Sequence, residues 1–311
     1  MNRKRIAGIC GAGLLALASI GSAQQIIIKG EFGNFGGTMA PPGLYAGVFG
    51  DIGWADQLKD AQGNTIARRP ELKQEIFGPL VQWVSTYQIF GANYGAMVAV
   101  PFANARAEFP RLGVSASTGL AFSQLWVVPV ELGWHFKDPL PLSQGGMDLT
   151  FHYAFYAPTG RYTAGAPNNT SLGMWVNELS LRATAFFDKD RQWTGTASLF
   201  YDFNSTKQGQ DWTTGNPFTY MWGLGHTYGA KDALFSGWFG LAGYAQWQVT
   251  DTTGVDAPLF ARLNKSRVYA VGPEFATLQG ALQVRYYWEF GARTAAQGQT
   301  LYVQFALPIG K

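Results

Sequence analysis

Residues that commonly carry out chemistry are few in this sequence, and their spacing does not form an active site. The chain has three histidines: His135, His152 and His226. None stands in a His-x-His or His-x-x-x-His pair, the spacing that places two imidazoles around one metal ion. A membrane-embedded serine hydrolase would need a serine two residues after a histidine, but those positions hold Lys137, Ala154 and Tyr228. We therefore predict that the protein is not an enzyme and has no catalytic, cofactor-binding or metal-binding residues.

The glycine-rich segment GLGHTYG, residues 223–229, resembles a nucleotide-binding loop only superficially. Its glycine spacing is wrong for a phosphate cradle, and no helical pattern follows it. We interpret the segment as a β-strand whose glycines let a neighbouring strand or the N-terminal segment approach closely.

Alternation of apolar and polar residues recurs along the chain and predicts about twelve β-strands. In residues 282–291, for example, Leu, Val, Tyr, Trp and Phe alternate with Gln, Arg, Tyr, Glu and Gly. Successive side chains of a strand point to opposite faces, so each such segment has one apolar and one polar face. The predicted strands lie near residues 44–55, 80–90, 93–102, 120–136, 147–157, 174–187, 193–204, 218–229, 235–249, 267–276, 281–291 and 300–309.

The composition indicates where the apolar faces of these strands lie. Hydrophobic residues make up 47% of the chain and aromatic residues 15%, whereas charged residues make up only 14%, against about a quarter in soluble domains. No segment after the N-terminus has the roughly eighteen uninterrupted apolar residues of a membrane helix. A closed sheet bonds all its backbone groups and can expose an apolar face to lipid. The alternative is a soluble β fold with an unusually aromatic core.

The N-terminus has the pattern of a secretory signal peptide, residues 1–23. Three basic residues precede the apolar run IAGICGAGLLALASI, and the small residues GSA follow it. The only cysteine, Cys10, lies in this signal, so we expect no disulfide or thiolate chemistry in the exported chain. Without its three basic residues, the 23 basic and 20 acidic residues of the chain balance. With no basic cluster either, we predict no nucleic-acid partner.

Connections between the predicted strands alternate between long and short. Those after the first, third, fifth, seventh and ninth strands are long, as in YTAGAPNNTSLG (162–173) and STKQGQDWTTGNP (205–217). Those after the second, sixth, eighth and tenth are short, such as FGAN, DKDRQ, AKDA and TLQG, while KDPLPLSQGG is intermediate. Outer-membrane barrels show this asymmetry, with short periplasmic turns and longer extracellular loops.

These patterns together predict an all-β, single-domain protein in the outer membrane of a Gram-negative bacterium. We expect an antiparallel, up-and-down transmembrane β-barrel of about twelve strands over residues 43–311, exported by a cleaved signal peptide. Residues 24–42 fit no strand, because of their glycines and the pair Pro41–Pro42. They are expected either as an irregular segment that plugs the pore or lies beneath it, or as a frayed tail.

Charged and aromatic side chains on the polar faces of the strands are candidates for the lumen. Ionisable groups at membrane depth are costly unless paired or wetted, so they should point inward. Their ion pairs would either brace the interior or form a selectivity lining. The candidate lumen-lining residues are Asp51, Glu131, Glu178, Arg182, Asp202, Glu274, Arg285, Glu289, Tyr45, Tyr244, Tyr287 and Trp238.

Several motifs resemble an outer-membrane family associated with the meta-cleavage pathway of phenol degradation. They are PPGLYAGVFGDIGWADQLKDAQGNTI (41–66), APTGRY (157–162), VGPEF (271–275) and RYYWEFGAR (285–293). One departure is the pair Ser123 and Gln124 before LWVVP, where the family pattern has Gly-Asp. The resemblance implies an outer-membrane β-barrel similar to uptake channels for hydrophobic compounds. It implies no catalytic residues.

The leading functional prediction is a passive channel that admits small hydrophobic or aromatic compounds without a cofactor. A twelve-stranded lumen falls between the filled interior of eight strands and the aqueous channel of sixteen, which favours a narrow solute. Its partners would be membrane lipid and that solute. One alternative is a non-conducting structural or adhesive barrel whose long loops, such as 56–79 and 204–217, bind partners. A membrane-embedded hydrolase is the third and least supported alternative.

Overall fold

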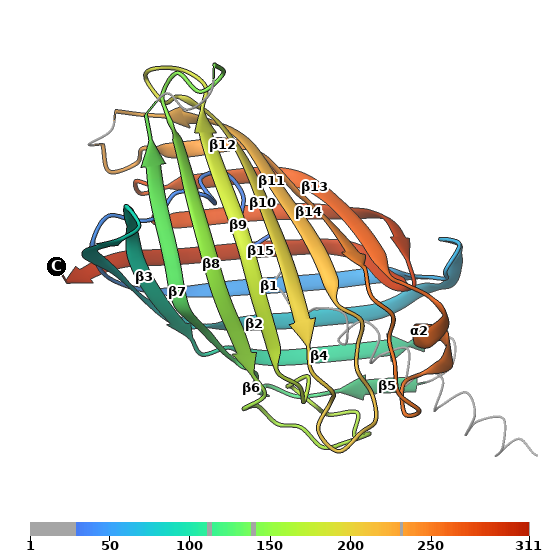
Figure 1. Ribbon diagram of the computed structural model, residues 1–311. Coiled ribbons are helices and arrows are strands. Elements are labelled where there is room, and N and C mark those ends of the chain that lie inside the picture. Colours follow the sequence, from blue (N-terminus) through green and yellow to red (C-terminus); the bar gives the residue numbers. More distant parts are fainter. Residues whose placement is uncertain (1–28, 111–113, 138–140, 231–232, 311) are drawn as a thin grey trace, which may run out of the picture.

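The chain folds into a closed antiparallel β-barrel (Figure 1). This computed structural model describes residues 29–110, 114–137, 141–230 and 233–310, except the side chains of 67–70 and 114. The predicted signal peptide and Cys10 lie outside the described residues. Strand β1 (Gly43–Lys59) pairs with β2 (Thr65–Ile89) on one side and with β15 (Ala295–Gly310) on the other, which closes the ring.

Twelve strands form the wall, which confirms the predicted fold class and strand number. Two of the strands are interrupted. One consists of β3 (Ala92–Ala99) and β4 (Phe102–Phe109), which both pair with β2, and its break lies at Pro101, which has no N–H to donate. The other consists of β5 (Val114–Ser117), β6 (Ala121–Phe122) and β7 (Leu125–Phe136).

The remaining strands follow one another around the barrel, each paired with its neighbours in sequence. They are β8 (Met147–Ala157), β9 (Val176–Phe186), β10 (Trp193–Asn204), β11 (Pro217–Tyr228), β12 (Gly237–Gln248), β13 (Arg267–Thr277) and β14 (Leu282–Arg293). A five-residue helix, α2 (Leu259–Leu263), lies between β12 and β13. No helix in the described part of the chain is both long enough and apolar enough to span a membrane.

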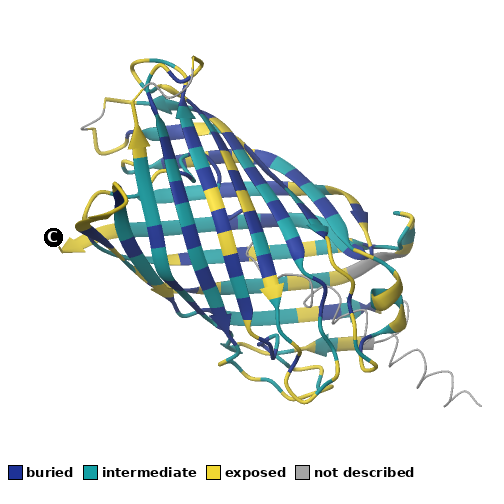
Figure 2. Cartoon of the chain, in the orientation of Figure 1, coloured by how far each residue is buried: buried dark blue, intermediate teal, exposed yellow. Residues whose placement is uncertain are grey.

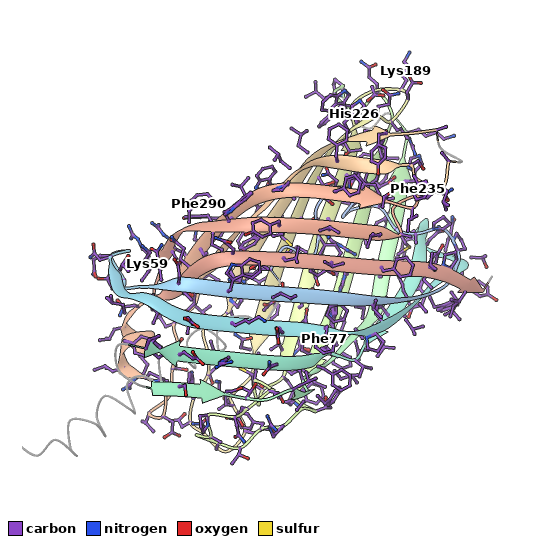
Figure 3. All side chains as sticks on the ribbon, turned by 180° about the vertical axis from the view of Figure 1, so that it is seen from behind. Lys59, Phe77, Lys189, His226, Phe235 and Phe290 are labelled. Atoms are coloured by element: carbon purple, nitrogen blue, oxygen red, sulfur yellow. The ribbon has the colours of Figure 1, made fainter. Side chains whose placement is uncertain are left out.

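Burial alternates along the strands, as Figure 2 shows by alternating colours. On β9, Glu178 and Arg182 are buried whereas Leu179 and Leu181 are 39% and 45% exposed. Figure 3 shows Phe77 and Phe290 on the outer surface, where they are 44% and 51% exposed. An outer face of Leu, Phe and Trp around a polar interior is the pattern of a lipid-facing barrel.

The strands on the long-loop side extend further than predicted. The segment 56–79, which we expected as a loop, belongs to β1 and β2, whose pairing continues to Lys59 and Thr65. A short turn joins them, in which the Asp60 carboxylate accepts hydrogen bonds from the backbone N–H groups of Gln62 and Asn64. The prediction failed because charged residues such as Lys59, Glu71 and Lys73 interrupt the apolar alternation in this segment.

The other connections follow the predicted asymmetry more closely. Irregular loops after β8, β10 and β12 lie at the end of the barrel that carries α2, away from the C-terminus (Figure 1). At the opposite end, the turn after β2 places Phe90 and Gly91 at φ 52° and 77°. Two successive residues with positive φ form the tight hairpin turn that fits the twist of neighbouring strands.

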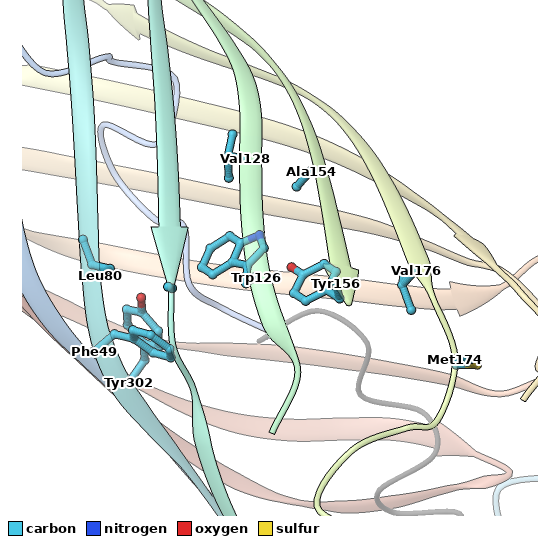
Figure 4. Packing of buried hydrophobic residues seen from close by; sticks show 10 residues of the cluster. Phe49, Leu80, Trp126, Val128, Ala154, Tyr156, Met174, Val176 and Tyr302 are labelled. Atoms are coloured by element: carbon cyan, nitrogen blue, oxygen red, sulfur yellow. The ribbon is translucent and has the colours of Figure 1, made fainter. Parts of the chain in front are cut away.

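An apolar cluster lies on the inner face of the barrel at its loop end (Figure 4). It is built from strands on both sides of the closure between β1 and β15. The core of the cluster consists of Phe49, Leu80, Ala99, Trp126, Val128, Ala154, Tyr156, Met174, Val176 and Tyr302. A second apolar cluster, which includes Phe200, Met221 and Tyr287, lies on β10 to β15. Buried polar side chains therefore lie between two apolar clusters on the inner face.

Candidate functional site

Residues 29–42 run through the barrel interior and bond to strands far away in the sequence. The Asn34 backbone N–H and side-chain amide both donate to the Glu274 carboxylate, at 2.8 and 2.7 Å. The Gly37 N–H donates to Thr184 Oγ1 at 3.0 Å, and Thr150 Oγ1 donates to the Gly37 carbonyl at 2.7 Å. These partners lie on β13, β9 and β8, so the segment contacts several strands of the wall.

Aromatic rings of this segment pack on the same wall. Phe32 stacks on Phe200 with ring centroids 5.6 Å apart, and the Arg182 guanidinium lies 4.3 Å from the Phe32 centroid. The Phe35 ring lies 4.6 Å from that of Trp238. Stacked rings and a cation over a ring each add stabilisation beyond simple burial. The segment is thus packed against the wall through its side chains as well as its backbone.

Glycines on the wall make room for the segment. A Cβ atom on Gly223 would lie 2.6 Å from the Asn34 backbone nitrogen, and one on Gly225 would lie 2.8 Å from the Asn34 side chain. The first distance is too short for any side chain, and the second leaves no room for one beside the Asn34 amide. Gly223 and Gly225 are therefore positions of close approach by the N-terminal segment, as the sequence predicted, whereas Gly229 lies against Ser236.

Two buried ion pairs brace the interior of the barrel. Arg285 bonds to Glu274 at 2.9 Å and also donates to the Glu31 carbonyl at 2.9 Å. Arg182 bonds to Glu131 at 2.6 Å. A buried ion pair is held well only when its remaining donors are also satisfied, and the Glu31 carbonyl does this for Arg285. The wall and the threaded segment are therefore tied into one network.

A second group of polar side chains is buried without protein partners. Both carboxylate oxygens of Asp202 and both ring nitrogens of His152 have no hydrogen-bond partner among the described residues. Glu178 accepts a hydrogen bond from the Tyr156 hydroxyl at 3.1 Å, and its other carboxylate oxygen lies 3.8 Å from His152 Nε2, beyond hydrogen-bond distance. Buried polar groups of this kind are normally satisfied by water. We conclude that this part of the lumen is wet.

The predicted lumen residues that remain form contacts near these two regions. Tyr244 donates to the Glu289 carboxylate at 2.6 Å, and Tyr287 donates to the Gly30 carbonyl at 3.1 Å. The Trp238 indole donates to Glu274 at 3.1 Å. Asp51 is buried on the inner face of β1. Tyr45 lies apart from the others, half-buried, with its hydroxyl bonded to the Pro41 carbonyl at 2.7 Å.

A cavity of about 540 Å³ lies at the loop end of the lumen, beside the first apolar cluster. Trp126 and Tyr156 form part of its wall, stacked almost in parallel with centroids 5.7 Å apart and an interplanar angle of 6° (Figure 4). The loops after β8 and β10 contribute further side chains. Charged side chains that face it from the strands and the threaded segment include Lys29, Asp51 and Glu289.

Sequence reasoning missed most of this cavity. Trp126 and Tyr156 follow the inward parity of their strands and could have been found from it. Tyr162, Lys207 and Trp212 line the cavity from loops, which have no periodicity to indicate a direction. Among the described residues, no group of three or more His, Cys, Asp or Glu side chains could hold a metal ion.

Residues 55–305 match the model of a family described as "Putative MetA-pathway of phenol degradation". The chain belongs to this family. The match confirms the resemblance carried by the sequence motifs. At the departure from the family pattern, Gln124 accepts a hydrogen bond from the Leu172 N–H at 2.7 Å and Ser123 donates to the Thr170 carbonyl at 2.7 Å. In this family member, these two residues fasten a loop over the cavity.

One solved structure shows the same architecture. An outer-membrane channel from Pseudomonas putida F1 superposes with a TM-score of 0.67, over 86% of this chain and 96% of that chain, at 12% identity. The transport unit of the autotransporter AIDA-I from Escherichia coli gives a TM-score of 0.45, over 96% of this chain and 97% of that chain, at 10% identity. No curated protein has a matching sequence. The first similarity shows that the chain has the fold of an outer-membrane barrel.

Proposed function

We propose that the protein is a passive channel in the outer membrane of a Gram-negative bacterium, and that it admits small hydrophobic or aromatic compounds. The observation that carries this proposal is the cavity at the loop end, whose wall includes the stacked rings of Trp126 and Tyr156. Aromatic walls suit flat, sparingly soluble molecules better than sugars. The family's association with phenol degradation and the fold shared with an outer-membrane channel support it. The protein's role is transport without catalysis.

The N-terminal segment is the plug of this channel in our proposal. It bonds to β8, β9 and β13, so a solute that leaves the cavity meets it before the short-turn end. Glycine at positions 33 and 37 lets its backbone lie against the wall. It packs on the inner wall, and the strand pairing that closes the barrel does not involve it, so it can shift without breaking the barrel. The domain boundaries are then a signal peptide at 1–23, the plug at 24–42 and the barrel at 43–311.

The charged lumen residues divide into two roles in the same proposal. Arg182, Arg285 and their carboxylate partners brace the plug, because all four side chains are buried and paired. Asp51 and Glu289 face the cavity and belong to the route of the solute. Selectivity therefore depends on the cavity more than on the two buried ion pairs.

Release of 4-methylbenzoate from loaded proteoliposomes tests the channel. We expect faster release with the protein than from protein-free liposomes. The variant Ala166→Trp should slow release, because Ala166 lines the cavity and a ring there would fill it. Ala164→Trp is the matched control, since Ala164 is exposed on the same loop and does not line the cavity. Equal release with and without the protein would refute the channel while leaving the fold intact.

A further inference from the structure

Lys207 is a buried cation without an anionic partner. It lies in the loop between β10 and β11, is 8% exposed and lines the cavity. Its ammonium lies 3.8 Å from the centroid of the Trp212 ring. It donates no hydrogen bond to a described residue, and no described carboxylate lies within 4 Å of it. Lysines this deeply buried are normally paired, because burying a lone charge is costly.

The other charged groups of the cavity do not supply that partner. Lys29 forms an ion pair with Glu289 at 3.2 Å. Asp51 and Glu289 lie on β1 and β14, deeper in the barrel than the loop that carries Lys207. Lys73 and Arg106 also line the cavity and pair with Glu75 and Glu108. Arg267 lines it too and lies over the Tyr269 ring. Lys207 and Arg267 are therefore the cations of the cavity that form no ion pair with a described residue, and Lys207 is the one carried by a loop at its mouth.

Two indole N–H groups on the same cavity also lack acceptors. Trp126 Nε1 and Trp212 Nε1 are buried and have no hydrogen-bond partner among the described residues. Both tryptophans line the cavity. With the Lys207 ammonium and the buried Arg267 Nε–H, the residues that line the cavity thus carry four donors that no described acceptor satisfies. Unsatisfied buried donors are costly, and the ligand that would satisfy all of them carries acceptor oxygens and negative charge.

We propose that this cavity is a recognition site for aromatic carboxylates, in which Lys207 binds the carboxylate and the stacked Trp126–Tyr156 pair contacts the ring. The inference deepens the proposed channel function and rests on it, by naming the solute class that the cavity selects. A volume of about 540 Å³ is within the range of small-molecule sites. The aromatic wall explains why a ring, rather than an acyl chain or a bare anion, accompanies the charge.

Calorimetric titration of the purified full-length protein in detergent micelles tests the site. The probes are 4-methylbenzoate and its neutral counterpart, 4-methylbenzyl alcohol. The wild type should bind the carboxylate more tightly than the alcohol. Lys207→Gln should weaken the carboxylate roughly tenfold or more, the effect of losing a charged hydrogen bond, and leave the alcohol unchanged. Lys265→Gln is the matched control, because Lys265 is exposed on the next loop and pairs with Asp251; its carboxylate affinity should equal that of the wild type.

Three results would overturn the proposal. The first is no carboxylate binding to the wild type, and the second is equal carboxylate affinity of the wild type and Lys207→Gln. The third is binding of acetate or inorganic phosphate as tight as that of 4-methylbenzoate, which would remove the role of the ring. Flux measurements separate this failure from that of the channel. If the protein transports neutral aromatic compounds but does not bind 4-methylbenzoate as predicted, the site is refuted and the channel is not. If it binds 4-methylbenzoate as predicted but shows no flux, the channel is refuted and the site is not.

Discussion

The two regions of the lumen differ in how their polar groups are satisfied. Around the threaded segment, Arg285 is bonded to both Glu274 and a backbone carbonyl of residue 31. At the cavity, Lys207 has only a ring beside it, and two indole N–H groups have no acceptor. In our proposal, the first region closes the pore and the second receives the solute; the Arg285 guanidinium is bonded within the chain, whereas the Lys207 ammonium has no acceptor among the described residues. This difference separates a structural region from a binding region within one barrel.

Removing the plug should have the largest effect. Deletion of residues 29–40 takes away the hydrogen bonds to Glu274, Thr184 and Thr150, while the barrel pairing from Gly43 onward is untouched. We expect the single-channel conductance in planar bilayers to rise several-fold, because a twelve-stranded lumen without a plug is open to water. The deletion variant should still show the heat-modifiable gel mobility of a folded barrel. An unchanged conductance would show that the segment does not close the pore.

Breaking the buried Arg285–Glu274 ion pair should affect stability more than selectivity. Arg285→Met leaves Glu274 buried and unpaired, and such a change costs about 3–5 kcal/mol. The free energy of unfolding in urea measures this loss. The double variant Arg285→Met with Glu274→Leu should recover most of it, because it removes both charges, and its preference for aromatic carboxylates should stay as in the wild type. A lost preference in the double variant would place the pair in the selectivity lining instead.

The pH dependence of carboxylate binding should report on Lys207. Burial lowers the pKa of Lys207 to about 8, so its charge, which the anion needs, is lost as the pH rises through that value. We expect the affinity for 4-methylbenzoate to be constant below this pKa and to fall by up to about tenfold per pH unit above it. Calorimetric titration over that range measures the change.

Other groups around the cavity provide the check on this assignment. The other charged or titratable side chains that line it are Lys29, Asp51, Lys73, Arg106, Tyr156, Tyr162, Arg267 and Glu289. Burial raises the pKa of Tyr162, so this tyrosine stays neutral in the range. The Lys207→Gln variant should bind weakly with no fall above pH 8; a fall that persisted in this variant would assign the titration to one of the other groups.

The smallest effect is expected at the indole of Trp126. Trp126→Phe keeps an aromatic ring against Tyr156 but removes the N–H that lacks an acceptor. A neutral hydrogen bond contributes about 0.5–1.5 kcal/mol, so carboxylate affinity should fall a few-fold and alcohol affinity should fall less. Equal affinity of the variant and the wild type for the carboxylate would show that this donor does not face the ligand.

The barrel could be predicted from the sequence because lipid imposes a strict alternation. Leu179 and Leu181 point outward while Glu178 and Arg182 point inward, and this period is visible without a structure. The hairpin formed by residues 56–79 was missed because charged residues such as Lys59, Glu71 and Lys73 interrupt that period. The strand positions were therefore predictable only where the apolar alternation is unbroken.

The site was less predictable for a different reason. Most of the charged residues proposed for the lumen are buried in the network around the plug, where parity gives their direction but not their partners. Lys207 reaches the cavity through a loop held by a backbone bond from its N–H to the Trp212 carbonyl. Only the folded loop brings this lysine and Trp126 to one cavity, since they are remote in the sequence.

Tethering the plug tests the central claim, that the N-terminal segment closes the lumen and must move for a solute to pass. Asn34→Cys with Gly225→Cys would place two thiols within disulfide reach, because a Cβ on Gly225 lies 2.8 Å from Asn34 Cγ. Leu199→Cys with Tyr220→Cys, which are register partners on β10 and β11, is the control that joins the wall alone. We predict that oxidation stops 4-methylbenzoate flux only in the first pair and that reduction restores it. Undiminished flux through the oxidised Asn34→Cys, Gly225→Cys protein would contradict the account.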